Sequence, residues 1–296
     1  IYRGQEHDNQ EWMRSPYKEP DHLGKISEYY EHNRREFRTE ETYTSPKTYQ
    51  SAAEWLSCHG QEDNYLLWIE GFDPHEPFDV PQKYLDMYAD DYVGKHFDWP
   101  PYAPFEGTPE ELRHIRNRYK ATLTMTDYWI GRVLDVCDQM NLWEDTMIIF
   151  TTDHGYMLGE HGLMAKNYMQ GYNEIYHIPL MIHQPGQSSG GRINALTQNI
   201  DLFPTICDHF AVPPEAIRNP IHGKSLMPLM NGQVDSLREG VLYGVYGKSV
   251  NLCDGRYTYF KAPVRQDNTP LNLYTSMPTT LKQRIVVDSI TDVGKI

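Results

Sequence analysis

The sequence predicts an α/β protein with a largely parallel central sheet flanked by helices and a smaller C-terminal antiparallel α+β portion. Three observations carry the main prediction. Residues 65–70 and 147–150 are continuous apolar runs of strand length, and a long amphipathic stretch lies between them. Strands that are apolar at consecutive positions are covered on both faces, as in parallel sheets. The order strand, helix, strand is typical of an α/β domain.

The long helix is predicted from its first turn and from its apolar stripe. Thr108, Pro109 and Glu111 suit the N-cap, the first helical position and the third position of a capping box. Buried-type side chains then recur three and four positions apart, at Leu112, Ile115, Tyr119, Leu123, Thr126, Ile130, Val133, Cys137 and Met140. This spacing predicts one buried stripe on a helix that ends near Asn141.

The other elements follow from shorter patterns. Residues 178–182 predict a third strand of the sheet, and Asp201 suits the N-cap of a short helix. Residues 1–60 are polar, so we assign them to surface helix and loop. Residues 79–107 lack periodicity, which predicts an irregular surface segment that forms part of a pocket wall.

The composition pattern changes near residue 235. Asp254-Gly255 between strand-forming residues predicts a β-hairpin there. We therefore expect residues 1–234 to be the remainder of a large α/β domain, and residues 235–296 to form a smaller, incomplete antiparallel subdomain.

Charge and cysteine content exclude several classes of protein. The 296 residues contain 41 acidic and 27 basic side chains, without a basic run, which argues against a nucleic-acid partner. No apolar segment approaches the ~18 residues that a membrane span needs. Four scattered cysteines without a C-x-x-C pair predict free, mostly buried thiols rather than a zinc or disulfide framework: Cys58, Cys137, Cys207 and Cys253.

Asp153 and His154 directly follow a predicted strand. Ligands of open α/β sheets sit at the carboxyl ends of strands, and an oxygen and a nitrogen donor side by side before Gly155 suit a divalent cation. The alternative is that Asp153 caps the next element and that His154 is a loop histidine with satisfied hydrogen bonds.

Lys166 and His75 are the other two candidates. Lys166 ends a glycine-rich loop, and its compact charge suits a sulfate or phosphate oxygen. His75 lies between Pro74 and Pro77 after the first predicted strand, and a histidine there can protonate a leaving alkoxide. Taken singly, Lys166 is more often a solvated surface lysine, and His75 is more often a structural loop histidine.

These motifs, in this order and spacing, resemble the sulfatase family of the alkaline phosphatase superfamily over residues 65–230. The blocks that carry the resemblance are Phe-Asp-Pro-His-Glu-Pro-Phe at 72–78, Thr-Asp-His-Gly at 152–155, Gly-Glu-His-Gly at 159–162 with Lys166, Ile-Pro-Leu-Met-Ile at 178–182, Asp-Leu-Phe-Pro-Thr at 201–205 and His-Gly-Lys-Ser-Leu at 222–226. The blocks at 178, 201 and 222 match structural positions of the family.

The resemblance implies a role for four residues. Asp153 and His154 match metal ligands of one divalent cation, calcium in most members and manganese or magnesium in others. Lys166 matches the lysine that binds the sulfate group. His75 matches the histidine that contacts the sulfate ester and serves as general acid toward the leaving oxygen. Lys166 and His75 are therefore both expected to be catalytic and to bind the substrate.

The nucleophile of the family has no counterpart in this chain. Members carry Cys or Ser in a C/S-x-P-x-R motif that is oxidised to formylglycine, and no cysteine here fits it, nor does Ser15 or Ser45. The family's first pair of acidic metal ligands is also unmatched. We expect both features upstream of Ile1, in the N-terminal part of the same protein. Residues 3–6 and Trp12 resemble an internal segment of bacterial sulfatases, so the chain is expected to be a fragment that is inactive alone.

The implied function is the hydrolysis of sulfuric esters, with a small-molecule or carbohydrate sulfate as substrate. Two alternatives stay open: a phosphonate monoester or phosphodiester hydrolase that uses the same cation pocket, and an inactive homologue that acts as a binding protein. Tyr84, Tyr92, Trp99 and Tyr102 either stack on the substrate or pack within their loop. The sequence favours no compartment and no oligomeric state.

Overall fold

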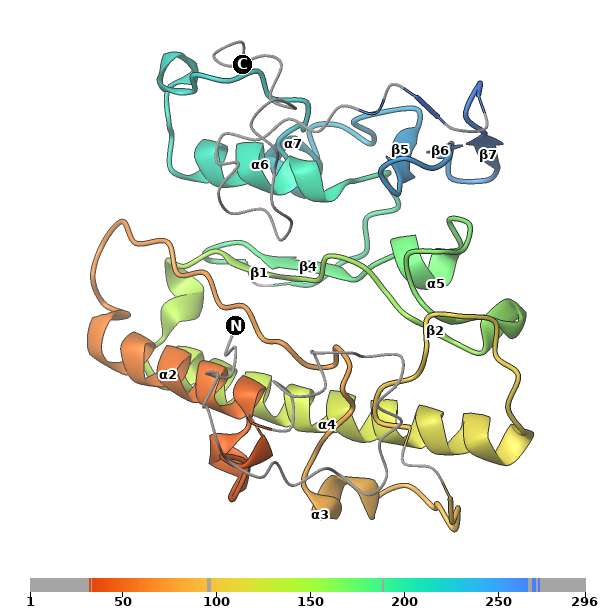
Figure 1. Ribbon diagram of the computed structural model, residues 1–296. Helices are drawn as coiled ribbons and strands as arrows, with labels where there is room; N and C mark the ends of the chain where they lie inside the picture. The colour runs from red at the N-terminus through yellow and green to blue at the C-terminus, as the bar shows by residue number, and fades with distance from the viewer. Residues whose placement is uncertain are drawn as a thin grey trace, which may run out of the picture. The chain divides into compact units, whose positions relative to one another are not determined.

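Figure 1 shows the computed structural model of the chain. It describes residues 32, 34–94, 97–187, 189–265, 268–269 and 271. The chain divides into two compact units between Val241 and Leu242, and each unit is described by itself. The boundary expected between residues 234 and 235 stays a prediction. The sulfatase-like segment around Arg3 and Trp12 lies outside the described residues.

The first unit contains all described helices and two pairs of strands. The α-helices are α2 (Thr44–His59), α3 (Gln82–Leu85), α4 (Pro109–Gln139), α5 (Asn173–Tyr176), α6 (Leu202–His209) and α7 (Met227–Met230). Single 3-10 turns are η1 (Glu40–Thr42), η2 (Leu142–Glu144), η3 (Glu160–Gly162), η4 (Asn199–Asp201) and η5 (Pro214–Ala216). The strands are β1 (Ile148–Thr151), β2 (Met157–Leu158), β3 (Met164–Ala165) and β4 (Leu180–His183).

Helix α4 begins as the sequence predicts. The Thr108 hydroxyl accepts a hydrogen bond from the Glu111 backbone N–H at 3.2 Å, and the Glu111 carboxylate accepts one from the Thr108 N–H at 2.7 Å. This reciprocal capping box satisfies two donors that the first helical turn leaves free. The predicted capping box is therefore confirmed, and the helix ends at Gln139.

The buried face of α4 differs in part from the predicted stripe. Ile115, Thr126, Val133 and Cys137 are buried, as expected, but Leu123 is 46% exposed. Polar residues occupy the middle of the buried face instead: Asn117, Arg118 and Thr122. Arg118 donates to the backbone carbonyl of Phe78, and Thr122 donates to that of Arg118. Apolar periodicity cannot reveal such positions, because internal hydrogen bonds offset the cost of burying them.

Helix α2 packs along α4 and contributes three of the eleven buried residues of the main core (Figure 1). Its buried side chains include Tyr49, Ala52 and Leu56, which contact the α4 residues Met125 and Trp129 within one cluster. The assignment of residues 1–60 to the surface is therefore wrong for this helix. Its apolar residues are few and are diluted by polar ones, so composition hides the face that packs.

Strands β1 and β4 pair antiparallel, with Thr151 opposite Leu180 and Ile148 opposite His183. Both strands were predicted. The parallel pairing expected between predicted strands is not formed by β1 and β4, which are antiparallel, as are β2 and β3. Because Thr151 and Leu180 are neighbours, the segment that joins them leaves and re-enters the sheet at one edge. That segment carries most of the candidate site.

Residues 65–70 do not form a strand. They run extended without a ladder partner among the described residues. Tyr65, Leu67 and Ile69 pack against the α2–α4 core, whereas Leu66 and Trp68 are 63% and 70% exposed. The expectation of a strand covered on both faces is therefore wrong for the described chain, where one face is covered and the other is exposed.

Residues 79–107 are irregular apart from α3, as predicted, and they lead back to the site. The backbone N–H of Phe105 donates to the carbonyl of Gly162 at 2.9 Å, and that of Met164 donates to Ala103 at 3.2 Å. A bridge between Pro104 and Leu163 lies between these bonds. The irregular segment thus runs beside the glycine-rich loop.

Asp201 does not cap α6 with its side chain, contrary to the prediction. Its fully buried carboxylate instead receives both terminal nitrogens of Arg238 at 2.5 Å and the backbone N–H groups of Gln198 and Lys224 at 2.8 Å. Burial alone would raise the pKa of Asp201, but these hydrogen bonds outweigh it and lower the pKa. Asp201 is the centre of a polar cluster that joins three segments.

The three-stranded sheet at the C-terminal side follows the order β5 (Val241–Gly244), β6 (Val250–Cys253) and β7 (Thr258–Lys261). Strands β6 and β7 pair antiparallel, with Cys253 opposite Thr258. The Asp254 carboxylate accepts the N–H groups of Arg256 and Tyr257, and Gly255 has a φ of +91°. The predicted Asp-Gly hairpin is confirmed, because glycine adopts this left-handed conformation without strain.

The four cysteines are free, as predicted, but only Cys137 is buried and Cys58 is exposed. The expectation of mostly buried thiols is therefore wrong. Across the described ranges, no helix combines the length and the apolar character that crossing a membrane requires.

Candidate active site

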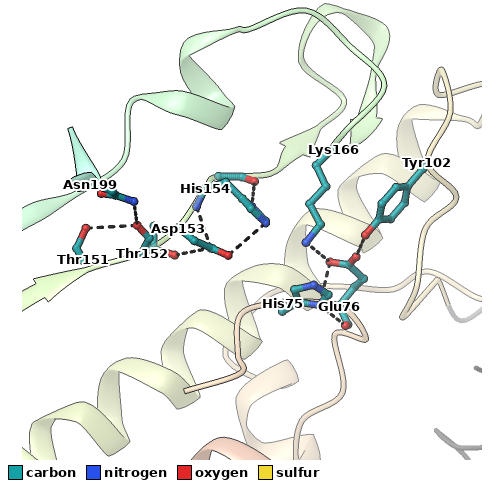
Figure 2. A network of polar contacts seen from close by, with 10 residues as sticks. His75, Glu76, Tyr102, Thr151, Thr152, Asp153, His154, Lys166 and Asn199 are labelled. Atoms are coloured by element: carbon teal, nitrogen blue, oxygen red, sulfur yellow. Dashed lines mark hydrogen bonds and ion pairs between the residues drawn. The ribbon is translucent and has the colours of Figure 1, made fainter. Parts of the chain in front are cut away.

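The segment between β1 and β4 carries three of the four predicted site residues: Asp153, His154 and Lys166 (Figure 2). Thr151 anchors its start, because its hydroxyl donates to the backbone carbonyl of Pro179 at 2.9 Å. Asn199 donates to the carbonyl of Thr152 at 3.2 Å. Thr151 thus joins the two ends of the loop, and Asn199 holds the first of them.

Asp153 and His154 form one donor pair. The Asp153 carboxylate accepts the His154 backbone N–H at 2.8 Å, and its second oxygen lies 3.6 Å from Nε2 of His154. The imidazole Nδ1–H donates to the backbone carbonyl of Gly155 at 3.0 Å. Nδ1 is therefore occupied, and Nε2 is the nitrogen left for a ligand. The Asp153 side chain is 82% exposed and that of His154 is 32% exposed, so both are accessible.

Gly155 is needed for this turn. A Cβ at this position would lie 1.8 Å from the backbone oxygen of Glu174. The Gly155 N–H donates to the carbonyl of Ile175 at 2.7 Å, which holds the two backbones in close contact. The sequence motif Asp-His-Gly thus reflects a steric requirement as well as a chemical one.

His75 lies on a loop that is tied to the start of α2. The backbone N–H of Asp73 donates to the Ser45 hydroxyl at 2.8 Å, and the N–H of His75 donates to the carbonyl of Phe72 at 3.0 Å. The His75 ring packs against the Phe72 ring with centroids 4.6 Å apart. Its Nδ1–H donates to the backbone carbonyl of Glu76 at 2.6 Å, which leaves Nε2 for a substrate.

Lys166 is almost completely buried, with 5% of its side chain exposed. It stands between Ala165 and Asn167, whose φ angles of 70° and 76° are left-handed. Such angles are costly for alanine and occur where surrounding structure imposes them, often at functional sites. The Lys166 ammonium lies 5.9 Å from the centroid of the Tyr156 ring.

Glu76 joins His75 to Lys166 (Figure 2). One oxygen of its fully buried carboxylate lies 3.7 Å from Lys166 Nζ and 3.4 Å from His75 Nδ1. The other oxygen accepts a hydrogen bond from the Tyr102 hydroxyl. The sequence analysis assigned no role to Glu76. Its position next to His75, between two prolines, was the only signal, because a glutamate is normally exposed.

The charges of these groups act on one another. Burial lowers the pKa of Lys166, and the Glu76 and Asp153 carboxylates oppose this effect. Burial also lowers the pKa of His75, against the charge and the carbonyl of Glu76, while Lys166 and His154 lower it further. All predicted site residues therefore belong to one electrostatic cluster. Within this cluster, Lys166 forms an ion pair with Glu76. Asp153 and His154 form a separate set of polar contacts.

Three of the four aromatic residues named in the irregular segment have different partners. Tyr84 is buried and donates to the Glu40 carboxylate, and Tyr92 packs against the ring of His114. Tyr102 contacts the site through Glu76. Its hydroxyl has a raised pKa because of burial and the carboxylate that accepts its hydrogen bond.

Asp153 and His154 fit a divalent cation as part of a coordination shell. A carboxylate oxygen and an imidazole nitrogen with its partner nitrogen already bonded are suitable donors for calcium, magnesium or manganese sites. Within the described ranges, however, no three His, Cys, Asp or Glu side chains converge on one point. Since divalent cations take four to eight ligands, these two residues are only part of a site.

Known proteins match this chain over most of its length. The sulfatase family model matches residues 5–212. A choline-sulfatase of Rhizobium meliloti is 29% identical over 216 residues, which are 66% of this chain and 41% of that protein. The multifunctional alkaline phosphatase superfamily protein PehA of Trinickia caryophylli is 39% identical over 124 residues, 40% of this chain and 23% of that protein. The chain thus spans less than half the length of these relatives.

A solved structure has the same fold. The phosphonate monoester hydrolase of Agrobacterium radiobacter superposes with a TM-score of 0.61, at 21% identity, over 76% of this chain and 53% of that chain. The match confirms the predicted fold class. Together with the family model, which covers more than two thirds of the chain, these findings confirm the predicted relationship: the chain belongs to the sulfatase family.

Proposed function

We propose that the protein hydrolyses sulfuric esters, with Lys166 and His75 on the ester and Asp153 and His154 on a divalent cation. The observation that carries this proposal is the buried Lys166 ammonium beside His75, on the loop that also presents the Asp153–His154 pair. An acidic chain needs such a local positive centre to bind an anion.

Lys166 binds a sulfate oxygen in this proposal. Its ammonium is a compact charge with three N–H donors, and burial removes most of the water that would compete with an ester. The attraction between its charge and an anion is stronger in this site than on the surface, because the local dielectric constant is lower. It therefore stabilises negative charge on the sulfate oxygens as the ester bond breaks.

His75 assists the departure of the alcohol. With Nδ1–H bonded to the Glu76 carbonyl, Nε2 carries the proton that moves to the leaving oxygen. Burial lowers the pKa of His75, which makes the protonated ring a stronger acid. The Glu76 carboxylate, 3.4 Å from the ring, limits this decrease.

Asp153 and His154 supply two ligands to the cation. A bound divalent cation supplies Lewis-acid stabilisation of charge and activates a nucleophile. Gly155 fixes the ring of His154, so that its Nε2 and the Asp153 carboxylate point to one place. The formylglycine nucleophile and the remaining ligands are proposed to come from another part of the protein, upstream of Ile1. We infer that the ion is calcium, with manganese or magnesium as alternatives.

The relatives and the exposed Asp153–His154 pair support the proposed substrate class. Choline-sulfatase is named for a small alkyl sulfate, and this chain matches it over 216 residues. We propose a small-molecule or carbohydrate sulfate as the substrate.

The second candidate is a phosphonate monoester or phosphodiester hydrolase. It is favoured by the fold match to a phosphonate monoester hydrolase and by the similarity to PehA. A sulfate monoester and a phosphonate monoester each present one negative charge at a tetrahedral centre, so Lys166 suits both. The third candidate, an inactive homologue that acts as a binding protein, would bind the anion without turnover.

A substrate panel separates the three candidates. The complete protein that carries this chain is assayed with 4-nitrophenyl sulfate and with 4-nitrophenyl phenylphosphonate, with calcium present. We expect the larger kcat/KM for the sulfate. A larger value for the phosphonate favours the second candidate, and no turnover of either ester, in a folded protein that binds inorganic sulfate, favours the third.

A further inference from the structure

Glu76 has the features of a functional residue, although it carries out no step of the proposed reaction. Its side chain is fully buried, its loop is the one that carries His75, and it contacts both proposed anion-binding side chains. A buried carboxylate is costly unless cations and hydrogen bonds compensate it. Its neighbours therefore indicate what it does.

The two carboxylate oxygens have different surroundings. Oε1 accepts a hydrogen bond from Tyr102. Oε2 has no hydrogen-bond partner among the described residues and lies 3.4 Å from His75 Nδ1 and 3.7 Å from Lys166 Nζ. The tyrosine thus holds one oxygen, while the other faces two nitrogens at distances that allow charge attraction but exceed a good hydrogen bond.

This separation matters for the ammonium of Lys166. A carboxylate in a tight hydrogen bond would occupy one of its three N–H donors and compete with the ester. At 3.7 Å, Glu76 compensates the charge and leaves the donors to the substrate. Without a nearby carboxylate, a lysine with 5% exposure would hold its proton less tightly, because burial disfavours the charged form.

We propose that Glu76 is a positioning residue of the anion site: held by Tyr102, it keeps Lys166 charged and fixes the ring of His75. The proposal rests on the function assigned to Lys166 and His75. It gives Tyr102 a defined role, which is to hold the carboxylate rather than to contact the ester. Glu76 itself does not touch the substrate, since its charge would repel a sulfate.

Other charged groups also act on Lys166. Asp153 raises its pKa, and His154 affects His75, which shares the Glu76 carboxylate. The Tyr156 ring faces the ammonium at 5.9 Å. Glu76 forms an ion pair with Lys166 at 3.7 Å, so we expect its removal to change Lys166 more than the removal of any of these groups.

The test follows the titration of Lys166 directly and needs no turnover. The Cε–Hε signals of the lysines are recorded by 1H–13C NMR against pH, and Lys166→Arg assigns the signal. We expect Glu76→Gln to lower the Lys166 midpoint by about one pH unit or more, tenfold in proton affinity. Glu76→Asp, which retains the charge, should restore at least half of that shift. Glu160→Gln is the matched control, because Glu160 contacts Arg116 and the Leu158 N–H rather than Lys166.

An unchanged Lys166 midpoint in folded Glu76→Gln overturns the proposal, whatever the protein hydrolyses. If Glu76→Gln does not fold, the double variant Glu76→Gln/Lys166→Met provides the second measurement. Removal of both charges leaves neither buried without a partner, so the double variant should fold and show a cooperative thermal transition where the single variant does not. A double variant that also fails to fold contradicts the pairing. A loss of sulfatase activity bears on the proposed function only, because the Lys166 titration can be measured in an inactive protein.

Discussion

The imidazole of His154 donates its Nδ1 hydrogen to the backbone carbonyl of Gly155, 3.0 Å away. This bond fixes the ring and leaves Nε2 beside the Asp153 carboxylate, 3.6 Å from its second oxygen. The turn that makes it possible has no room for a side chain at Gly155. Backbone sterics and ligand geometry are therefore coupled in three consecutive residues.

Gly155→Ala should disrupt this turn. Its Cβ would meet the Glu174 carbonyl oxygen at 1.8 Å, so one backbone must move. We expect a loss of about 1–3 kcal/mol in the free energy of unfolding, as for other overpacked sites. The matched control is Gly131→Ala within α4, where no atom lies within 4 Å and the variant should be about 0.5–1 kcal/mol more stable. Urea unfolding measures both; equal effects of the two substitutions would contradict this account.

Cation binding should depend on the Asp153–His154 pair. Calcium added to the complete protein should raise its melting temperature, and excess EDTA should reverse the rise. Asp153→Asn and His154→Ala should each weaken calcium binding about tenfold or more, since they remove a ligand where second-shell changes alone cost about 10–100-fold. Asp145→Asn is the control, because it removes the same charge as Asp153→Asn at an exposed position outside the site. Unaltered calcium stabilisation in both site variants would remove these residues from the cation site.

Asp73 should make stability depend on pH. Burial raises its pKa to about 7 from 3.8. Between these values the folded protein holds a proton that the unfolded chain has released, so this contribution to stability is full below pH 3.8 and is lost as the pH rises through 7. Relative to the wild type, Asp73→Asn should therefore gain stability from pH 4 to pH 8, by about 1–4 kcal/mol. Urea unfolding at both pH values checks this, and a difference that does not change with pH would refute it.

The Arg238–Asp201 pair should be a main contributor to the stability of the first unit. Arg238→Met leaves the fully buried Asp201 carboxylate without its bidentate partner. Loss of one partner of a buried pair typically costs about 3–5 kcal/mol. Arg132→Met, which breaks an exposed pair with Asp135, is expected to cost under about 1 kcal/mol. Thermal unfolding that ranks the two variants equally would show that the buried pair adds nothing.

Local patterns predicted the elements that depend on neighbouring residues. The capping box of Thr108 and Glu111 and the turn at Asp254 were confirmed because their hydrogen bonds join residues two or three positions apart. The extended run at 65–70 was not found as a strand, because a strand requires a partner that periodicity cannot supply. The burial of α2 was missed for a related reason, since its packing face is defined only against α4.

The site was predicted in part. Motif order identified His75, Asp153, His154 and Lys166, and the structure places them in one electrostatic cluster. Glu76 was given no role and Tyr102 only a stacking or packing role, because their hydrogen bond joins residues 26 positions apart. The antiparallel pairing of Thr151 with Leu180 was also unforeseen, although it is what makes the segment between them a single loop at one edge.

The most direct test of the proposed function is the rate of aryl sulfate hydrolysis by the complete protein and its site variants. Lys166→Ala and His75→Ala should each lower kcat/KM about 100-fold or more, because each removes charge stabilisation or proton transfer in the transition state. Lys120→Ala and His59→Ala, on exposed positions outside the site, should retain wild-type values. Site variants that hydrolyse the sulfate at the wild-type rate would contradict the proposed function of this loop.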